Sequence, residues 1–302
     1  MSPRVLVTGG SGFVGGHVVA ALRELGEDRA GGPEVRLLMR GAPDTSPGLE
    51  TARADLTAPA TLRGVCDGVD VVLHCASHVG ADERLTRSVN EHGTRALVEE
   101  AFRAGVRRIV YVSTAAVYGR GPFTRALPAE VPLAPASPTS RARAAAERCV
   151  LDAGGVVLRP HLVLGAGDRW VVPGVGALLA GLGARLHCEA RHSFVKVMAL
   201  AKAVVAVGLA DDAPTGAHHV NHPRPAHTSE LVEAVSGHLA LPLPGPPLTL
   251  EEARARLRDE PRLLHHLDML AVDHWFVDDE WWDGVSGDGA EDVSVASCLG
   301  TP

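Results

Sequence analysis

Tyrosine, lysine and aromatic residues in general are scarce in this sequence. Aromatic side chains make up 4% of its 302 residues, so alanine, valine and leucine must fill most of the core. The chain has only two tyrosines, Tyr111 and Tyr118, and only two lysines, Lys196 and Lys202. Phenol and ammonium groups are among those whose pKa values proteins adjust for proton transfer. Few positions in this chain can therefore supply such a group.

Cysteine pairs, basic excess and long apolar runs are also missing. The five cysteines form no Cys-x-x-Cys pair, which predicts a reduced, cytoplasmic compartment. A net charge of -7 disfavours a nucleic-acid surface. The longest apolar stretch, Trp170–Leu186, is interrupted by Pro173 and by glycines, so no membrane span is expected. A strand beginning at Arg4 leaves no room for a signal peptide.

Short apolar runs alternate with helical patterns over the first half of the chain, which is typical of a parallel sheet covered by helices. The predicted strands are Val5–Thr8, Val35–Met39, Val69–His74, Arg108–Ser113 and Val156–Arg159, and the predicted helices include Gly16–Leu25 and Glu91–Ala104. The pattern predicts an α/β Rossmann fold, with a doubly wound parallel sheet, for residues 1–165.

The strand–helix pattern weakens after Gly165, where proline and glycine become frequent. We expect residues 166–302 to form a smaller C-terminal α/β substrate-binding region, interleaved with the first domain. Thr249-Leu-Glu-Glu252 has the form of a capping box that opens a helix. From about residue 284 the chain is acidic and rich in small residues, which predicts a loosely held tail.

A glycine-rich segment, Thr8-Gly-Gly-Ser-Gly-Phe-Val-Gly15, lies between the first strand and the first helix. Gly9 permits a tight turn, Gly12 lets the backbone approach a pyrophosphate, and Gly15 allows the helix to pack closely on the strand. The helix start then presents free N–H groups to the phosphates. The segment predicts dinucleotide binding by Thr8, Gly9, Gly12, Phe13, Val14 and Gly15.

The end of the second strand indicates which dinucleotide is preferred. An acidic residue there would bind a ribose 2′-hydroxyl, but this chain has Arg40, with Arg36 in the same strand. Because a guanidinium suits a 2′-phosphate, the sequence favours NADP (NADPH) over NAD. NAD remains an expected second form, since the glycine segment binds the pyrophosphate that both share.

Six short motifs occur in an order that resembles the extended short-chain dehydrogenase/reductase family over nearly the whole chain. They are Thr8–Gly15, Ala54-Asp55-Leu56, Leu73-His-Cys-Ala-Ser77, Asn90-Glu-His-Gly-Thr94, Tyr111-Val-Ser-Thr-Ala-Ala-Val-Tyr-Gly119 and Leu158-Arg-Pro160. The resemblance implies roles for several cofactor-binding residues. Asp55 and Leu56 would border the adenine; Cys75, Ala76 and Ser77 would line the dinucleotide; and Pro160 and Val163 would approach the nicotinamide.

The same resemblance implies catalytic positions, and this chain departs from the family there. Thr114, with Ser113 beside it, takes the catalytic serine or threonine position, and Tyr118 belongs to the Val-Tyr-Gly that follows. The family's Tyr-x-x-x-Lys is replaced by Thr139 and Arg143. Their i,i+4 spacing still places both on one helix face.

The usual proton transfer is excluded by these replacements. Reduction of a ketone needs a hydride at carbon and a proton at oxygen, and Thr139 is a poor net proton source. Arg143 stays protonated and can hold hydroxyl groups, but it cannot relay a proton. Three replacements remain open: Tyr118, a histidine such as His78, His161 or His192, and an acidic phenol on the substrate itself.

Two groups of nearby histidines could suggest metal ligands: His218, His219 and His222, and His265 and His266. No cysteine or carboxylate completes a recognisable ligand spacing around them, so the sequence predicts none.

The substrate region is predicted to be apolar. Many family members carry an acidic pair where this chain has Met198 and Ala199, which disfavours a nucleotide sugar and favours a small-molecule aromatic ketone. Loss of the Tyr/Lys pair resembles atypical ketoreductases that act on angucyclinone polyketides in antibiotic biosynthesis. We therefore expect an NADPH-dependent ketoreductase. The alternatives are a non-catalytic NADP-binding sensor and, least favoured, a nucleotide-sugar epimerase, dehydratase or reductase.

Overall fold

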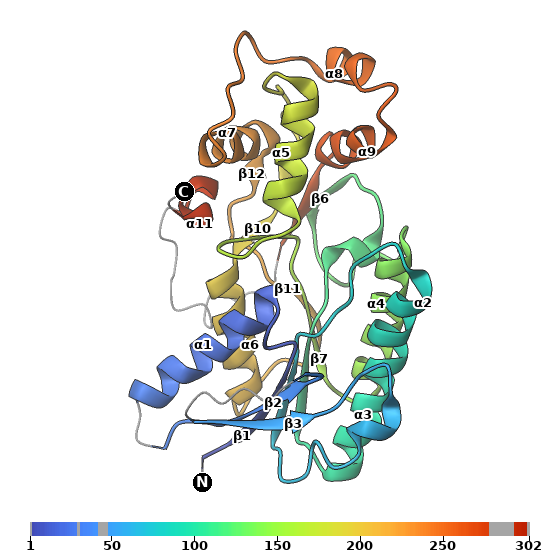
Figure 1. The fold of residues 1–302 in the computed structure, drawn as a ribbon, viewed down its shortest axis with the longest axis vertical. Coiled ribbons are helices and arrows are strands. Elements are labelled where there is room, and N and C mark those ends of the chain that lie inside the picture. Colours follow the sequence, from blue (N-terminus) through green and yellow to red (C-terminus); the bar gives the residue numbers. More distant parts are fainter. Residues whose placement is uncertain (1, 29–30, 42–47, 278–292, 301–302) are drawn as a thin grey trace.

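Seven parallel strands form the main sheet of the computed structural model, which describes residues 2–28, 31–41, 48–277 and 293–300. Figure 1 shows this sheet in the larger part of the molecule, with a smaller helical part beyond it. In spatial order the strands are β11 (Gly216–His219), β7 (Val156–Arg159), β5 (Arg108–Val112), β4 (Val71–His74), β1 (Arg4–Thr8), β2 (Glu34–Met39) and β3 (Leu49–Arg53).

The strand order reverses direction at β1. The chain adds β2 and β3 on one side and returns to add β4, β5, β7 and β11 on the other. All the pairings are parallel, for example Val7 of β1 beside Leu37 of β2 and Leu73 of β4. Ligands of such sheets bind outside the carboxyl ends of the strands where the order reverses. The predicted doubly wound sheet is confirmed, and its reversal lies between β1 and β4.

Helices cover both faces of the sheet. One face packs against α1 (Phe13–Asp28) and α6 (Val197–Leu209), which also contact each other. The opposite face packs against α2 (Glu83–Arg87), the π-helical turn η2 (Ser88–Gly93), α3 (Thr94–Ala104) and α4 (Pro138–Asp152). The valines and leucines of the strands are buried on both sides, as expected for continuous apolar strands of a parallel sheet.

The first domain includes elements from beyond residue 165. Helix α6 covers the sheet beside α1, and β11 adds its seventh strand next to β7. Met198 and Ala199, predicted near the substrate, lie at the start of α6 and pack against the core of this face. Residues from beyond Gly165 therefore contribute both a strand of the main sheet and a helix that covers it.

The smaller region has its own core between short sheets and helices. Its four-stranded sheet has the order β12 (Ala226–His227), β9 (Arg191–His192), β13 (His274–Phe276) and β6 (Phe123–Ala126), and β10 (Phe194–Lys196) pairs with β8 (Leu162–Leu164). Its helices are α5 (Val171–Leu182), α7 (Thr228–His238), α8 (Leu250–Arg256), α9 (Pro261–Leu270) and α11 (Val295–Leu299), while short 3-10 turns η1 (Pro59–Leu62) and η3 (Ala115–Tyr118) belong to the larger region.

Three sequence expectations can be compared with this region. The predicted capping box is confirmed, because Thr249 and Glu252 bond reciprocally at the start of α8. The apolar stretch after Trp170 forms α5, buried in the smaller core, and among the described residues no helix has the length and apolarity to cross a membrane. Within the predicted loose tail, residues 284–292 and 301–302 lie outside the described residues. Helix α11, however, packs on α7 and buries Val295, so residues 293–300 differ from that expectation.

Candidate active site

The glycine turn between β1 and α1 has a geometry that side chains would block. Gly9 has a positive φ of 73°, and a Cβ there would lie 2.7 Å from the backbone of Ala76, in the loop after β4. A Cβ at Gly15 would lie 2.1 Å from the carbonyl oxygen of Gly9. The turn therefore lets β1, the start of α1 and the loop after β4 approach one another, which leaves the first turn of α1 open to a ligand.

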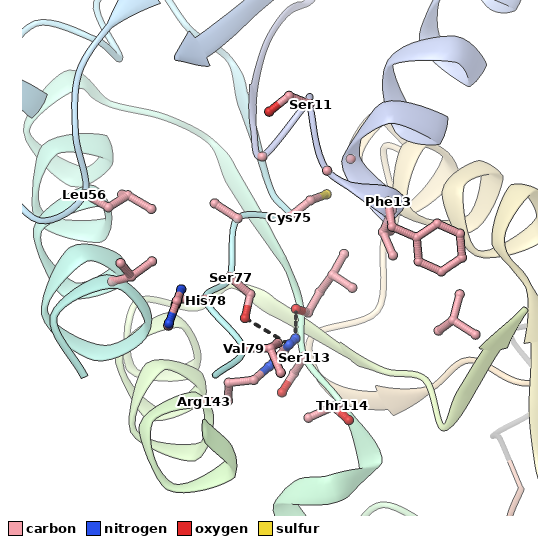
Figure 2. A pocket seen from close by; sticks show the side chains of 18 of the residues that line it. Ser11, Phe13, Leu56, Cys75, Ser77, His78, Val79, Ser113, Thr114 and Arg143 are labelled. Atoms are coloured by element: carbon pink, nitrogen blue, oxygen red, sulfur yellow. Dashed lines mark hydrogen bonds between the residues drawn. The ribbon is translucent and has the colours of Figure 1, made fainter. Parts of the chain in front are cut away.

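A cleft of about 770 Å³ opens at this turn. Figure 2 shows side chains from the glycine turn, the loop after β4, the end of β5 and α4 around it. Of the residues predicted to bind the dinucleotide, the lining includes Gly9, Gly12, Phe13, Val14, Gly15, Arg40, Asp55, Leu56, Cys75, Ala76, Ser77, Pro160 and Val163. The structure thus brings together residues from four of the six motifs, with Arg40 and Val163, at the carboxyl ends of the sheet.

Thr8 is the predicted cofactor residue that does not line the cleft. It is fully buried, and its hydroxyl accepts from the Ala76 N–H at 3.2 Å and bonds to His74 Nδ1 at 2.6 Å. The other nitrogen of His74 bonds to Thr94 Oγ1 at 2.8 Å. Burial lowers the pKa of His74 to about 3, so its ring is neutral near pH 7. Thr8 therefore does not face the cleft. Its hydrogen bond to the Ala76 N–H holds the loop that carries Cys75, Ala76 and Ser77.

The two arginines of β2 have different surroundings. Arg36 is buried, pairs with Glu50 at 2.9 Å and donates to the carbonyl of Val65, so it stabilises the fold and does not line the cleft. Arg40 is exposed at the end of the strand and lines the cleft. The pKa of the Asp55 carboxyl is lowered. The main cause is the hydrogen bond from the N–H of Thr57, and the charge of Arg40 also contributes.

Arg143, in the family's lysine position, is fixed at the centre of the cleft. Its guanidinium donates to the carbonyl of Val112 at 2.5 Å and to Ser77 Oγ at 3.2 Å, and it lies over the ring of Tyr111 at 5.8 Å. Figure 2 shows it pointing from α4 toward the end of β5. Because arginine stays protonated, it places a permanent positive charge beside Ser113 and Thr114.

Ser113 and Thr114 differ in what their hydroxyls bond. Ser113 is 2% exposed, and its hydroxyl donates to the carboxylate of Glu147 behind the cleft. Thr114 is partly exposed in the cleft, and its Oγ1 accepts from the N–H of Ala116 at 3.2 Å. That bond leaves the hydroxyl hydrogen of Thr114 available to a ligand, whereas the Ser113 hydrogen is used inside the protein.

Tyr118 lies in the same buried network and does not line the cleft. Its hydroxyl accepts from Arg159 Nη1 at 2.8 Å and bonds to His219 Nε2 at 2.7 Å. The ring of His219 bonds through Nδ1 to the carbonyl of Val277, which makes Nε2 the acceptor of the tyrosine hydrogen. Arg159 also pairs with Glu147 at 2.6 Å, and both side chains are almost fully buried.

Thr139, in the family's tyrosine position, is partly buried at the start of α4. It is not among the residues that line the cleft. The helix start is held by Ser137 and Ser140, which form a capping box around it. The structure thus gives Arg143, but not Thr139, a place in the cleft.

The cleft contains further residues that the motifs did not identify. His78 and His161 line it, as the resemblance suggested, but His192 lies buried behind His161. Trp170 is 58% exposed at the cleft and Asp168 caps the following helix, accepting from the N–H of Val172 at 2.8 Å. Gly165 and Gly167 precede Asp168 and Trp170 and indicate a loop. The local sequence contains no pattern that would place this loop at a cleft.

Comparisons with known proteins agree with this geometry. The NAD dependent epimerase/dehydratase family matches residues 5–221. The chain belongs to this family. Its fold and motifs are those of an extended short-chain dehydrogenase/reductase, and it is an NAD(P)-dependent enzyme of the oxidoreductase type.

Two curated relatives and one solved structure illustrate the range of similarity. A UDP-glucose 4-epimerase of Azospirillum brasilense is 32% identical over 55% of this chain, which spans half the length of that protein. A 2-alkyl-3-oxoalkanoate reductase of Stenotrophomonas maltophilia is 27% identical over 90% of this chain and 91% of its own. The Bordetella bronchiseptica enzyme WbmH in complex with NAD+ has a TM-score of 0.68 and 26% identity, covering 82% of this chain and 85% of its own.

Replacing Tyr118 with phenylalanine tests whether this residue is structural. We expect Tyr118→Phe to lower the free energy of unfolding by about 1–3 kcal/mol, because Arg159 and His219 each lose a buried partner. Dinucleotide affinity, measured by calorimetry, should stay within about twofold of the parent, since the ring does not line the cleft. A fall in turnover of about 100-fold or more at unchanged stability would instead identify Tyr118 as the proton donor.

Proposed function

We propose that this protein is an NADPH-dependent ketoreductase that acts on a polycyclic aromatic ketone and takes the proton from a phenol of that substrate. The observation that carries the proposal is the absence of a phenol from the cleft. Tyr111 and Tyr118 are both buried, and neither is among the lining residues. The titratable groups that do line it include a fixed cation, Arg143.

The residues present fit a nicotinamide dinucleotide. The glycine turn and the start of α1 would bind the pyrophosphate, Asp55 and Leu56 would border the adenine, and Arg40 would bind a 2′-phosphate. The bound NADPH supplies a hydride. Cys75 would contact it as a neutral thiol, because burial raises the pKa of that group to about 12.

Arg143 would act on the substrate through its charge. A positive charge within a few ångströms favours the ionised form of a phenol, which makes the phenol a stronger acid. The same charge stabilises negative charge that develops on a carbonyl oxygen. The bonds of Arg143 to Val112 and Ser77 hold it in place, so little reorganisation is needed during the reaction.

Thr114 would orient the carbonyl. Its hydroxyl hydrogen is available in the cleft, since its oxygen already accepts from Ala116. It would donate a hydrogen bond to the substrate oxygen without giving up its proton. Ser113 would contribute indirectly, by tying the end of β5 to Glu147.

The open side of the cleft supports an aromatic substrate. Val79, Leu85, Val89, Trp170 and Val171 line it and offer apolar and aromatic surface. The relative from Stenotrophomonas is by name a reductase of a 3-oxo compound, which supports carbonyl reduction. The epimerase relative matches a shorter part, and epimerisation in this family requires the base that Thr139 replaces.

Arg40 is expected to set the preference for NADPH. Arg40→Ala should weaken NADPH binding by about tenfold or more and leave NADH binding nearly unchanged, because only NADPH has the 2′-phosphate. Calorimetric titration with both dinucleotides measures this. Arg53→Ala is the matched control, since Arg53 is exposed on the neighbouring strand and does not line the cleft. Equal affinities of the parent for NADPH and NADH would contradict the assignment.

A matched pair of ketones tests the source of the proton. An aryl ketone with an adjacent phenol should be reduced with NADPH, whereas its O-methyl ether should bind but react at least about 100-fold more slowly. The ether lacks the acidic hydrogen and keeps most of the apolar contacts. Consumption of NADPH and the mass of the product report the reaction.

The other outcomes of this experiment are informative. Equal rates for phenol and ether would show that the protein supplies the acid. Tight NADPH binding without turnover of any ketone would favour the non-catalytic sensor.

A further inference from the structure

Three histidines from separate parts of the chain meet beside the cleft. His161 follows β7, His192 ends β9 and His274 begins β13, and one ring nitrogen of each lies within 4.8 Å of the others. His192 and His274 are buried, while His161 is partly buried and lines the cleft. The family motifs assign no role to this group, which we call the histidine triad.

The rings of the histidine triad lie in a triangle. The distances between ring centroids are 5.3, 5.7 and 5.8 Å, and the ring planes are within 11–14° of parallel. Because the three distances are nearly equal, the rings cannot form a column. An imidazole bound to zinc at about 2.0–2.1 Å has its centroid about 3.2 Å from the metal. Three such rings around one ion would be about 5.2–5.5 Å apart, close to the observed spacing.

Hydrogen bonds to backbone carbonyls determine which ring nitrogens of His192 and His274 keep a lone pair. His192 Nε2 bonds to the carbonyl of Leu270 at 3.2 Å, and His274 Nδ1 bonds to the carbonyl of Val272 at 3.1 Å. A carbonyl only accepts, so those nitrogens carry the hydrogens, and His192 Nδ1 and His274 Nε2 keep lone pairs. Metal-bound histidines are typically oriented by such bonds to backbone carbonyls.

The remaining nitrogens are weakly satisfied in the protein. His161 Nε2 is buried and has no hydrogen-bond partner among the described residues. His274 Nε2 accepts only a long bond, 3.3 Å, from the N–H of Gly121. A buried polar atom without a partner requires an explanation, and a bound water or ion is one.

A negative charge lies beside the histidine triad. Asp273 precedes His274 in the chain, and its carboxylate accepts from the N–H of Arg191, the neighbour of His192, at 2.8 Å. That charge would offset part of the charge of an ion.

We infer that His161, His192 and His274 form a binding site for one divalent transition-metal ion of the zinc type, at the edge of the cleft. Three neutral imidazoles suit zinc, cobalt, nickel and copper, and they do not suit magnesium or calcium. With three protein ligands the ion keeps an open position, as in catalytic zinc sites. This inference does not depend on the proposed reaction, because it rests on the geometry of the three side chains.

Cobalt(II) binding to the full-length protein tests the site. Protein treated with a chelator and then dialysed is titrated with Co²⁺, and visible absorption and calorimetry report binding. We expect one ion per chain, with the intense visible bands of a low-coordinate imidazole site, displaced by Zn²⁺. His161→Ala, His192→Ala and His274→Ala should each weaken the affinity at least about tenfold.

Control variants separate this site from a surface site. His187 and His227 both lie near Glu189, at 3.6 and 3.8 Å; His187 is exposed and His227 is half-buried. His187→Ala and His227→Ala should leave Co²⁺ affinity unchanged. Since buried substitutions can impair folding, circular dichroism is recorded for each variant, and His161→Gln, at the cleft edge, serves as the least disruptive replacement.

Two results would overturn the inference. One is the absence of Co²⁺ and Zn²⁺ binding by the parent protein. The other is binding that survives in folded variants of the histidine triad and is lost in His187→Ala or His227→Ala.

Discussion

The ion pair between Glu147 of α4 and Arg159 of β7 determines which groups can face the cleft. Both side chains are almost fully buried, so each charge needs the other as a partner. Glu147 accepts from Ser113 and Arg159 donates to Tyr118, so the pair connects the helix of the catalytic positions with the ends of β5 and β7. It thereby engages the hydroxyl groups of Ser113 and Tyr118 in hydrogen bonds inside the protein.

The residues that line the cleft are well suited to binding a dinucleotide and poorly suited to donating a proton. The glycine turn opens the start of α1, and Arg143 is fixed by Val112 and Ser77. A fixed cation strengthens an acid that the substrate brings and stabilises charge on its oxygen. In the proposed reaction, binding and preorganisation would supply much of the rate, and the substrate would supply the proton.

Sequence alone predicted most of the main sheet and singled out residues that the structure gathers in one cleft, because these depend on short-range signals. Apolar runs defined the strands, and at Gly9 and Gly15 a Cβ would collide with backbone atoms. The additional strands β3 and β11 were not predicted. β3 carries a mixed polar pattern, and β11 contains two histidines and joins the sheet 55 or more residues after the preceding main-sheet strand.

The proton-transfer half of the site was harder to predict, because its contacts join distant residues. Tyr118 lies in a family motif, yet its partners Arg159 and His219 come 41 and 101 residues later. His218, His219 and His222 are close in sequence, whereas the structure brings together His161, His192 and His274, which are far apart in the chain. The topology of the fold brings these side chains together, and no local sequence pattern predicts that they meet.

The dependence of turnover on pH, measured for a series of ketones whose adjacent phenols differ in acidity, tests the central claim most directly. If the substrate supplies the proton, activity falls as the pH rises past the pKa of the bound phenol, and this pKa moves down with each more acidic phenol. The account predicts that shift with NADPH at saturation. A descending limb at one fixed pH for all the substrates would contradict it and would place the acid on the protein.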